Sequence, residues 1–177
     1  MRLTALDADA ARLQRVEENL QRLRLLAPTV TLACADASNL DAWWDGKPFD
    51  AILADVPCTG SGVVRRHPDI RWLRRDTDIE QTAALQRRIC DALWRTLRPG
   101  GHLLYVTCSV FPEECEAQAR AFAQRHEDAQ RLSSLGQLLP GIKGPHPDHD
   151  GFFYALFTKG GGGDREAAAS AERAGPT

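Results

Sequence analysis

The sequence predicts an α/β fold with a mostly parallel sheet in three layers. Short apolar runs rich in β-forming residues alternate with longer segments whose apolar residues recur every three or four positions. Two of the short runs are followed by cysteine-containing turns, at Cys58 and Cys108, and one amphipathic segment lies between them. This is the order of strand, crossover helix and strand. We therefore expect both thiols at the carboxyl edge of a parallel sheet, where ligands bind.

The first part of the chain is expected to hold three strands and one helix. The strands are predicted at residues 2–7, 30–35 and 49–54, and the helix over about 9–26. Four apolar residues on one face indicate the helix, and Pro28 marks its end. Asp7 and Asp36 end the first two strands.

The rest of the chain is expected to add two helices and two strands. The helices are predicted at about 77–97 and 112–126, and the strands at 102–106 and 151–158. Pro112 suits the first turn of the second helix, and Glu113 and Glu114 suit its positive end. Residues 60–75 form a Gly- and Arg-rich segment, 133–150 are expected to be loop-rich, and 160–177 to be a disordered tail with almost nothing to bury.

Length and composition are those of an ordinary globular protein. The chain has 177 residues, of which 43% are hydrophobic and 26% charged, and its net charge is −2, which allows one domain with a substantial core. No apolar run approaches the length of a membrane span, and the first residues lack the apolar core of a signal peptide. The near-neutral charge is no general sign of nucleic-acid binding, so that inference depends on local patches.

The cysteines favour reduced thiols in the cytoplasm. There are five, at irregular spacing, which argues against a secreted disulfide framework. Cys34, Cys90 and Cys115 are expected to serve packing. We expect no metal site, because the sequence has no Cys-x-x-Cys pair and His146 and His149 lack partner ligands at zinc-like spacing.

Four motifs occur in a fixed order: Asp55-Val-Pro-Cys-Thr-Gly-Ser-Gly62, Arg65-Arg-His-Pro-Asp-Ile-Arg-Trp-Leu-Arg-Arg75, Thr107-Cys-Ser-Val-Phe-Pro-Glu-Glu114 and Asp150-Gly-Phe-Phe-Tyr-Ala155. Together they resemble the RNA cytosine-5 methyltransferase family, most closely its bacterial members that act on small-subunit ribosomal RNA. The likeness covers roughly residues 2–159. It implies a Rossmann-like, S-adenosylmethionine-dependent methyltransferase sheet.

The sequence departs from this family at its beginning. Family members have an upstream RNA-binding helical domain, then a first strand and a Gly-rich cofactor loop, and no such loop follows a first strand here. The likeness thus implies that residues 1–159 are a partial catalytic domain. The missing strand would lie between those at 2–7 and 49–54, so residues 1–177 alone are expected to be poorly stable and to bind S-adenosylmethionine weakly.

The chemistry of cytosine explains why two thiols are useful at one sheet edge. Carbon 5 is a poor nucleophile until a thiolate adds to carbon 6 and turns the ring into an enamine, which is covalent catalysis. On this ground either cysteine could attack. The resemblance implies that Cys108 attacks, that Cys58 helps to expel the product, and that Asp55 hydrogen-bonds the base edge. The alternative is that each cysteine is a small buried hydrophobe, which the matched positions of the two disfavour.

Carboxylates at the strand ends are candidates for holding the cofactor. Acidic residues there can accept hydrogen bonds from ribose hydroxyls. The resemblance implies that Asp7 binds the ribose of S-adenosylmethionine, that Asp36 lies near its adenine, and that Asp55 also borders the cofactor. The alternative for Asp7 and Asp36 is helix capping.

One dense basic patch follows the first thiol loop. It consists of Arg65, Arg66, Arg71, Arg74 and Arg75, together with His67 and Trp72. Beside a catalytic loop such residues can contact RNA phosphates and stack on a base. We expect RNA binding by Arg65, Arg66, Arg71 and Trp72. The alternative is a solvated face, salt-bridged by nearby aspartates.

The sequence therefore predicts an enzyme that methylates carbon 5 of a cytosine in 16S ribosomal RNA through a covalent cysteine adduct. Its cofactor is S-adenosylmethionine and its partner RNA, with no membrane and no metal. One alternative is a sister enzyme of the same family that methylates transfer RNA. Another is a non-catalytic remnant that binds RNA or a protein partner.

Overall fold

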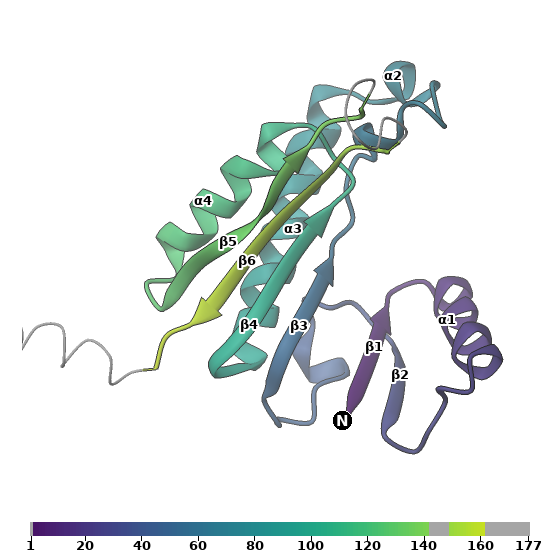
Figure 1. The fold of residues 1–177 in the computed structure, drawn as a ribbon, viewed down its shortest axis with the longest axis vertical. Coiled ribbons are helices and arrows are strands. Elements are labelled where there is room, and N and C mark those ends of the chain that lie inside the picture. The colour runs from purple at the N-terminus through teal and green to yellow at the C-terminus, as the bar shows by residue number, and fades with distance from the viewer. Residues whose placement is uncertain (1, 142–148, 162–177) are drawn as a thin grey trace, which may run out of the picture. The chain divides into compact units, whose positions relative to one another are not determined.

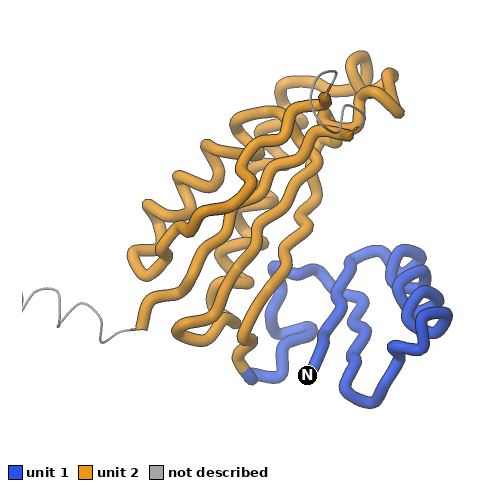
Figure 2. Tube along the Cα trace, viewed as in Figure 1, with its two compact units in different colours: residues 1–47 blue, residues 48–177 orange. Residues whose placement is uncertain are grey.

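The computed structural model describes residues 2–141 and 149–161. The chain divides into two compact units, residues 1–47 and 48–177, which Figure 2 shows in blue and orange.

The first unit is a two-stranded parallel sheet with one helix. It consists of β1 (Leu3–Asp7), α1 (Ala10–Arg22) and β2 (Val30–Cys34), with Asp7 paired to Cys34 at the carboxyl edge. Helix α1 contacts both strands. Its amino-terminal cap is Asp9, whose carboxylate accepts from the backbone N–H groups of Ala11 and Arg12.

The second unit contains a four-stranded sheet in the order β3-β4-β6-β5 (Figure 1). Its elements are β3 (Phe49–Asp55), α2 (Ile70–Leu73), α3 (Asp76–Thr96), β4 (Leu97–Thr107), α4 (Glu116–Arg125), β5 (Ala129–Leu138) and β6 (Phe152–Lys159). Strand β4 is parallel to β3, and β6 is antiparallel to both β4 and β5. Hence β3, β4 and β5 run in one direction, and only β6 is reversed.

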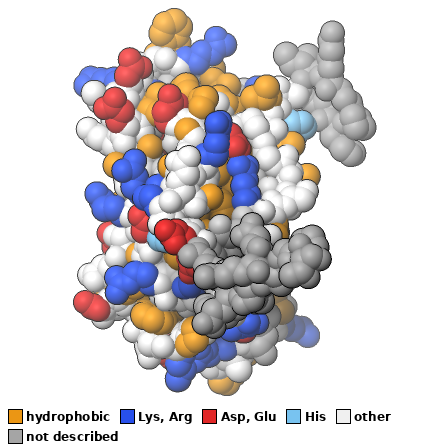
Figure 3. All heavy atoms as spheres, turned by 90° about the vertical axis from the view of Figure 1, so that its left-hand side faces the viewer, with side chains coloured by type: hydrophobic (Ala, Val, Ile, Leu, Met, Phe, Trp, Pro, Cys, Tyr) orange, Lys and Arg blue, Asp and Glu red, His pale blue; other side chains and the backbone are white. Residues whose placement is uncertain are grey.

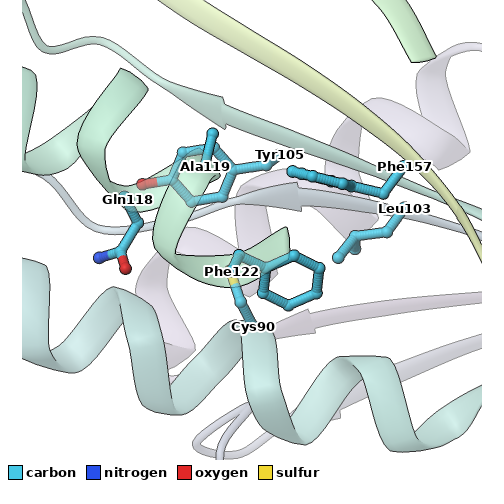
Figure 4. A pocket seen from close by; sticks show the side chains of 7 residues that line it. All are labelled: Cys90, Leu103, Tyr105, Gln118, Ala119, Phe122 and Phe157. Carbon is cyan, nitrogen blue, oxygen red and sulfur yellow. The ribbon is translucent and has the colours of Figure 1, made fainter. Parts of the chain in front are cut away.

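The core of this unit lies between the sheet and helices α3 and α4, which cover the same face (Figure 1). Along β6 the buried side chains alternate, as a half-covered strand requires: Phe153, Ala155 and Phe157 are at most 1% exposed. The void shown in Figure 4 lies in this core, between the helices and β4 and β6, and measures about 10 Å³. It is lined mainly by apolar groups and has room for at most one water, so it is a packing gap and no binding site.

Most expected elements are present, with several corrections. A short helix, α2, lies in the Gly- and Arg-rich segment, and β4 begins at Leu97, before the expected residue 102. Residues 133–138 were expected to be loop but belong to β5. They escape notice because β5 is a polar edge strand whose register shifts between Leu132 and Gly136, which breaks the period-two pattern. The helix expected over about 112–126 is divided into a 3₁₀ turn, Pro112–Glu114, and α4.

Some expectations remain predictions. Within each unit the described helices cover one face of the strands. A three-layer arrangement would involve both units, so it remains a prediction. The domain boundary at residue 159 is also untested. The tail expected to be disordered falls, from residue 162 onward, outside the described residues.

The surface has no strong bias of charge where Figure 3 shows it. Lys and Arg side chains are interspersed with Asp and Glu and with apolar groups. No helix of the described residues is long and apolar enough to cross a membrane. Any contact with a charged partner therefore has to be sought in a local arrangement of side chains.

Candidate active site

Two neighbouring parallel strands deliver both thiols to one place. Asp55, at the end of β3, is in register with Val106 of β4, so the turns after the two strands begin at the same edge. The Sγ atoms of Cys58 and Cys108 lie 3.0 Å apart. Both residues are partly exposed, so this pair is accessible and does not belong to the core.

The two thiols differ in acidity. The hydrogen bond from Cys58 lowers the pKa of the Cys108 thiol to about 7, against the opposing effects of burial and of the Asp55 carboxylate. The same hydrogen bond, together with burial, raises the pKa of Cys58 far above the usual thiol range. Near neutral pH a substantial fraction of the pair is therefore a Cys108 thiolate that accepts a hydrogen bond from the Cys58 thiol.

Asp55 lies beside this pair on the same edge. Desolvation raises the pKa of its carboxyl group, although the residue as a whole remains exposed. Its negative charge disfavours the negative charge of the Cys108 thiolate and so raises the pKa of that thiol. A carboxyl group that holds its proton more readily than usual can donate to a polar atom of a bound ligand as well as accept from one.

The buried carboxylate of Glu114 joins the two thiol loops. Glu114 is 0% exposed. Its Oε1 accepts from the N–H of Thr59 at 2.9 Å and from Nε2 of Gln86 at 3.2 Å. Its Oε2 accepts from the hydroxyls of Thr59 and Ser109 at 2.5 and 2.6 Å. Because Thr59 and Ser109 directly follow Cys58 and Cys108, one side chain fixes both loops.

Further hydrogen bonds hold the backbone on each side of the first thiol. Nε2 of Gln86, which is 0% exposed, donates to the carbonyl of Pro57 at 2.8 Å. Nε of Arg74 donates to the carbonyl of Thr59 at 2.7 Å. The Tyr105 hydroxyl lies 3.0 Å from Oε1 of Gln86 and 2.7 Å from the Glu114 carbonyl. The position of Cys58 is thus set by residues from α3, β4 and the segment before α4.

Two glycines allow three distant segments to meet at the site. The N–H of Gly62 donates to the carbonyl of Cys108 at 2.8 Å, and the N–H of Gly151 donates to the carbonyl of Gly62 at 2.8 Å. A Cβ atom on Gly62 would overlap the Gly151 carbonyl and lie 2.7 Å from that of Cys108. Only glycine fits there without displacing backbone.

The structure separates the residues expected to bind RNA into two groups. Arg65 lies 3.4 Å from the Gly141 carbonyl, and Arg66 forms an ion pair of 2.5 Å with Asp150, so both hold parts of this unit together. Arg71 and Trp72 belong to α2 and are exposed, Trp72 by 86%. The alternative of a face salt-bridged by nearby aspartates is not what Arg66 shows, because its partner, Asp150, is distant in sequence.

Asp7 and Asp36 lie at the carboxyl edge of the β1–β2 sheet. Neither is the cap of α1, which is Asp9. Oδ1 of Asp7 accepts from the N–H of Asp9 at 2.8 Å. Oδ1 of Asp36 accepts from the N–H and hydroxyl of Ser38, both at 2.8 Å. The alternative that Asp7 itself caps α1 is therefore wrong, because Asp7 accepts a hydrogen bond from Asp9, which is the cap.

The remaining cysteines are free, as expected, but differ in burial. Cys90 and Cys115 are 3% and 0% exposed and serve packing. Cys34 was expected to do the same but is exposed, because it ends β2 at the open edge of the first unit. Among the described residues, no three His, Cys, Asp or Glu side chains form a group that could hold a metal ion.

Sequence reasoning missed Glu114, Gln86 and Arg74 as parts of the site. Glu114 was interpreted as a charge at a helix start, and Gln86 as one residue of an amphipathic helix. A usable signal was present: each site cysteine is followed by a hydroxyl residue, Thr59 or Ser109. Paired hydroxyls at two meeting strand ends indicate a common acceptor.

Comparisons with known proteins agree with the family resemblance of the sequence motifs. A family model described as 16S rRNA methyltransferase RsmB/F matches residues 1–158. A protein of Vibrio cholerae serotype O1 named ribosomal RNA small subunit methyltransferase B is 48% identical over 162 residues, which are 89% of this chain and 36% of that protein. A protein of the same name from Serratia proteamaculans is 50% identical over 157 residues, 88% of this chain and 36% of that protein. The chain thus spans little more than a third of these relatives.

Solved structures agree. NSun6 from Pyrococcus horikoshii, determined with SFG, has a TM-score of 0.72 and 33% identity, over 89% of this chain and 41% of that one. A methyltransferase homologue from the same organism has a TM-score of 0.69 and 31% identity, over 89% and 53% of the two chains. The fold expected from the sequence, a mostly parallel Rossmann-like methyltransferase sheet, is confirmed.

Replacing Glu114 tests its role as the joint between the loops. In Glu114→Gln an N–H₂ group replaces one oxygen and faces groups that also donate. We expect the free energy of unfolding, measured by urea denaturation, to fall by about 1–3 kcal/mol, the cost of leaving buried polar groups unpaired. The neighbouring Glu113→Gln is the matched control, because Glu113 is exposed. Equal stability of the two variants would show that the carboxylate joins nothing of consequence.

The acidity of Cys108 can be measured by alkylation. The thiolate reacts with iodoacetamide and the thiol does not, so the rate at Cys108 should rise with pH, with a midpoint near 7. In Cys58→Ala the donor is absent, and the midpoint should move up toward the ordinary thiol value of about 8.5. Mass spectrometry of the Cys108 peptide gives the rate.

Asp55→Asn should shift the pH midpoint of Cys108 alkylation in the opposite direction to Cys58→Ala. The Asp55 carboxylate raises the pKa of Cys108, so its removal should move the midpoint down. If the pH midpoint of Cys108 alkylation is the same in Cys58→Ala and Asp55→Asn as in the unchanged chain, neither Cys58 nor Asp55 controls the charge on Cys108.

Proposed function

The chain belongs to the family of 16S rRNA methyltransferases RsmB/F, and from this membership we propose that it carries the thiol site of an enzyme that methylates carbon 5 of a cytosine in 16S ribosomal RNA. The resemblance found in the sequence is thereby confirmed at the level of the family. The observation that supports the proposal most is the pair of sulfur atoms 3.0 Å apart at the ends of β3 and β4.

The unequal acidity of the pair supports the proposed roles. The Cys108 thiolate adds to carbon 6 of the cytosine, which forms a carbon–sulfur bond and makes carbon 5 nucleophilic. After carbon 5 has gained a methyl group, a base removes its proton, the carbon–sulfur bond breaks, and the electron pair returns to Cys108. The Cys58 thiol, with its raised pKa, can donate a hydrogen bond to the sulfur that leaves.

Asp55 suits the edge of the base. The desolvation that raises the pKa of its carboxyl group favours a proton that it can share with a ring nitrogen as electrons move into the ring. The position of Asp55, at the end of β3 and three residues before Cys58, is appropriate for a group that touches the same base as the thiols. Extrusion of the base from its stack is needed to bring it there.

S-adenosylmethionine is the cofactor that this chemistry calls for, and when bound it supplies the methyl group. The residues present fit part of its site. Asp7 and Asp36 offer carboxylates at the carboxyl edge of parallel strands, where ribose hydroxyls are commonly bound. Among the described residues no hydrogen bond is made to Oδ2 of Asp7, so this oxygen can accept from a hydroxyl. Asp36 is proposed to lie near the adenine, and Asp55 to border the cofactor from the side of the base.

The substrate proposed is ribosomal RNA. The names of the curated relatives favour it over the transfer-RNA alternative. Arg65, Arg66, Arg71 and Trp72 are proposed to contact the RNA, with Arg71 and Trp72 the more accessible of them. The cytoplasmic location expected from the free thiols remains a prediction.

The rival class is a non-catalytic remnant that binds RNA or a protein partner. A remnant has no use for an acidic Cys108 thiol held beside a weakly acidic one, and the joint provided by Glu114 maintains that pair. The thiol pair therefore favours the catalytic alternative.

Two single substitutions test the assigned roles. The chain is incubated with 16S ribosomal RNA and a large excess of S-adenosylmethionine, because the chain is expected to bind this cofactor weakly. The pH is about 8.5, the ordinary thiol pKa, where Cys108 is expected to be substantially ionised even without Cys58. Cys108→Ala should abolish both methylation and covalent capture of RNA. Cys58→Ala should accumulate a protein–RNA adduct that survives denaturing electrophoresis, because addition proceeds and release fails.

The exposed Cys34→Ala is the matched control and should behave as the unchanged chain does. An adduct formed by Cys108→Ala would reverse the two roles. No adduct with any variant would favour the non-catalytic alternative.

A further inference from the structure

A second cavity lies next to the thiol pair and is not needed for the proposed reaction at Cys108. It is open to solvent, measures about 300 Å³, and lies wholly in the second unit. Its wall comes from four segments: the turn after the Cys58 loop, helix α2, the start of α3, and the residues after Cys108. A volume near 300 Å³ is at the lower end of small-ligand sites.

The wall of the cavity continues the backbone that carries the thiols. Ser61 and Val110 both line it, and the N–H of Val110 donates to the Ser61 hydroxyl at 3.0 Å. Val110 is two residues from Cys108, which limits the separation of their Cα atoms to about 7 Å. This is comparable to the spacing of neighbouring nucleotides in an extended strand. A nucleotide chain that places one base at Cys108 therefore brings the next nucleotide to this cavity.

The cavity attracts anions. Arg71, Arg74 and Arg75 line it, with one carboxylate, Asp76. Nε of Arg74 donates to the Thr59 carbonyl, which fixes that side chain against the Cys58 loop. In the part of the chain that the structure describes, Arg71 and Arg75 form no ion pair, although Asp76 is near. Guanidinium groups without a carboxylate partner match the geometry of a phosphate group.

The rest of the wall is apolar. Phe111, Ile70 and Ile79 are among the residues that line it, and the backbone N–H of Phe111 donates to the Ser109 hydroxyl at 3.1 Å. An inorganic anion would need no such surface. Single-stranded RNA presents a phosphate and an unstacked base together, and its bases bind to aromatic and apolar side chains.

We propose that this cavity binds the nucleotide next to the target cytosine in single-stranded RNA, with its phosphate among Arg71, Arg74 and Arg75 and its base against Phe111. This subsite rests on the proposed function, because the RNA chemistry at Cys108 defines its neighbour. It shifts the basic contact from Arg65 and Arg66, which hold other parts of the unit, to the arginines at α2 and the start of α3.

Photo-crosslinking tests the subsite. The probe is a single-stranded RNA of 16S sequence with 5-iodouridine on either side of a cytosine, and mass spectrometry of the irradiated chain identifies the attached peptide. We expect attachment at Phe111. In the double variant Arg71→Ala/Arg75→Ala the yield should fall at least tenfold. The slope of log affinity against log salt should become shallower by about 0.7 for each phosphate that the arginines no longer neutralise.

The double variant Arg87→Ala/Arg88→Ala is the matched control. It removes the same charge from exposed positions of α3 outside the cavity, so it should retain the Phe111 attachment and the salt slope. Thermal unfolding of both double variants, expected to be unchanged, excludes a general loss of structure. Attachment elsewhere, or equal reductions in the two variants, would overturn the subsite.

The same RNA distinguishes this proposal from the proposed function. If Cys108 captures the RNA covalently while Phe111 is not attached, the cavity proposal fails and the methyltransferase proposal stands. If Phe111 is attached and the arginine variant abolishes this attachment, but Cys58→Ala supplied with S-adenosylmethionine forms no adduct at Cys108, the cavity proposal stands and the catalytic proposal fails.

Discussion

The geometry of the site depends on one buried carboxylate. An unpaired charge away from water would cost several kcal/mol, yet Glu114 is tolerated because the backbone N–H and hydroxyl of Thr59, the amide of Gln86 and the hydroxyl of Ser109 all donate to it. Parallel pairing of β3 and β4 brings the two loops to one edge but leaves their conformations open. The carboxylate removes that freedom, and the 3.0 Å separation of the sulfur atoms follows.

The electrostatics of the pair follow from this enforced contact. Two thiols held together cannot both ionise at low cost, so the first proton to leave produces a thiolate that the other thiol stabilises. Asp55 opposes ionisation of Cys108 and Cys58 favours it. The resulting pKa near 7 is a compromise between these effects, and it leaves a substantial fraction of Cys108 as thiolate at neutral pH.

Those parts of the structure with a local cause could be predicted from the sequence, and those with a distant cause could not. Strands β3 and β4 and helix α3 were predictable because their apolar residues repeat at the period of each element. Strand β5 was not, because Ser133, Ser134 and Gly136 interrupt that pattern and pairing with β6 alone makes it a strand. The two thiols could be identified from their motifs. The role of Glu114 could not, since an acidic residue after Pro112 has an adequate local explanation in the helix start, and its donors lie elsewhere in the chain.

The structure explains why glycines occur in these motifs, which the spacing of the motifs alone does not. Gly62 and Gly151 belong to motifs far apart in the chain, and each would collide with the other segment if it carried a Cβ atom. Their contact ties the segment before β6 to the Cys58 loop, and the Arg66–Asp150 ion pair closes the same junction from outside. Because β6 is the reversed strand beside β4, its start lies at the edge where β4 ends. The single antiparallel strand of the described sheet therefore brings a third segment to the thiols, which an all-parallel sheet would carry to the opposite edge.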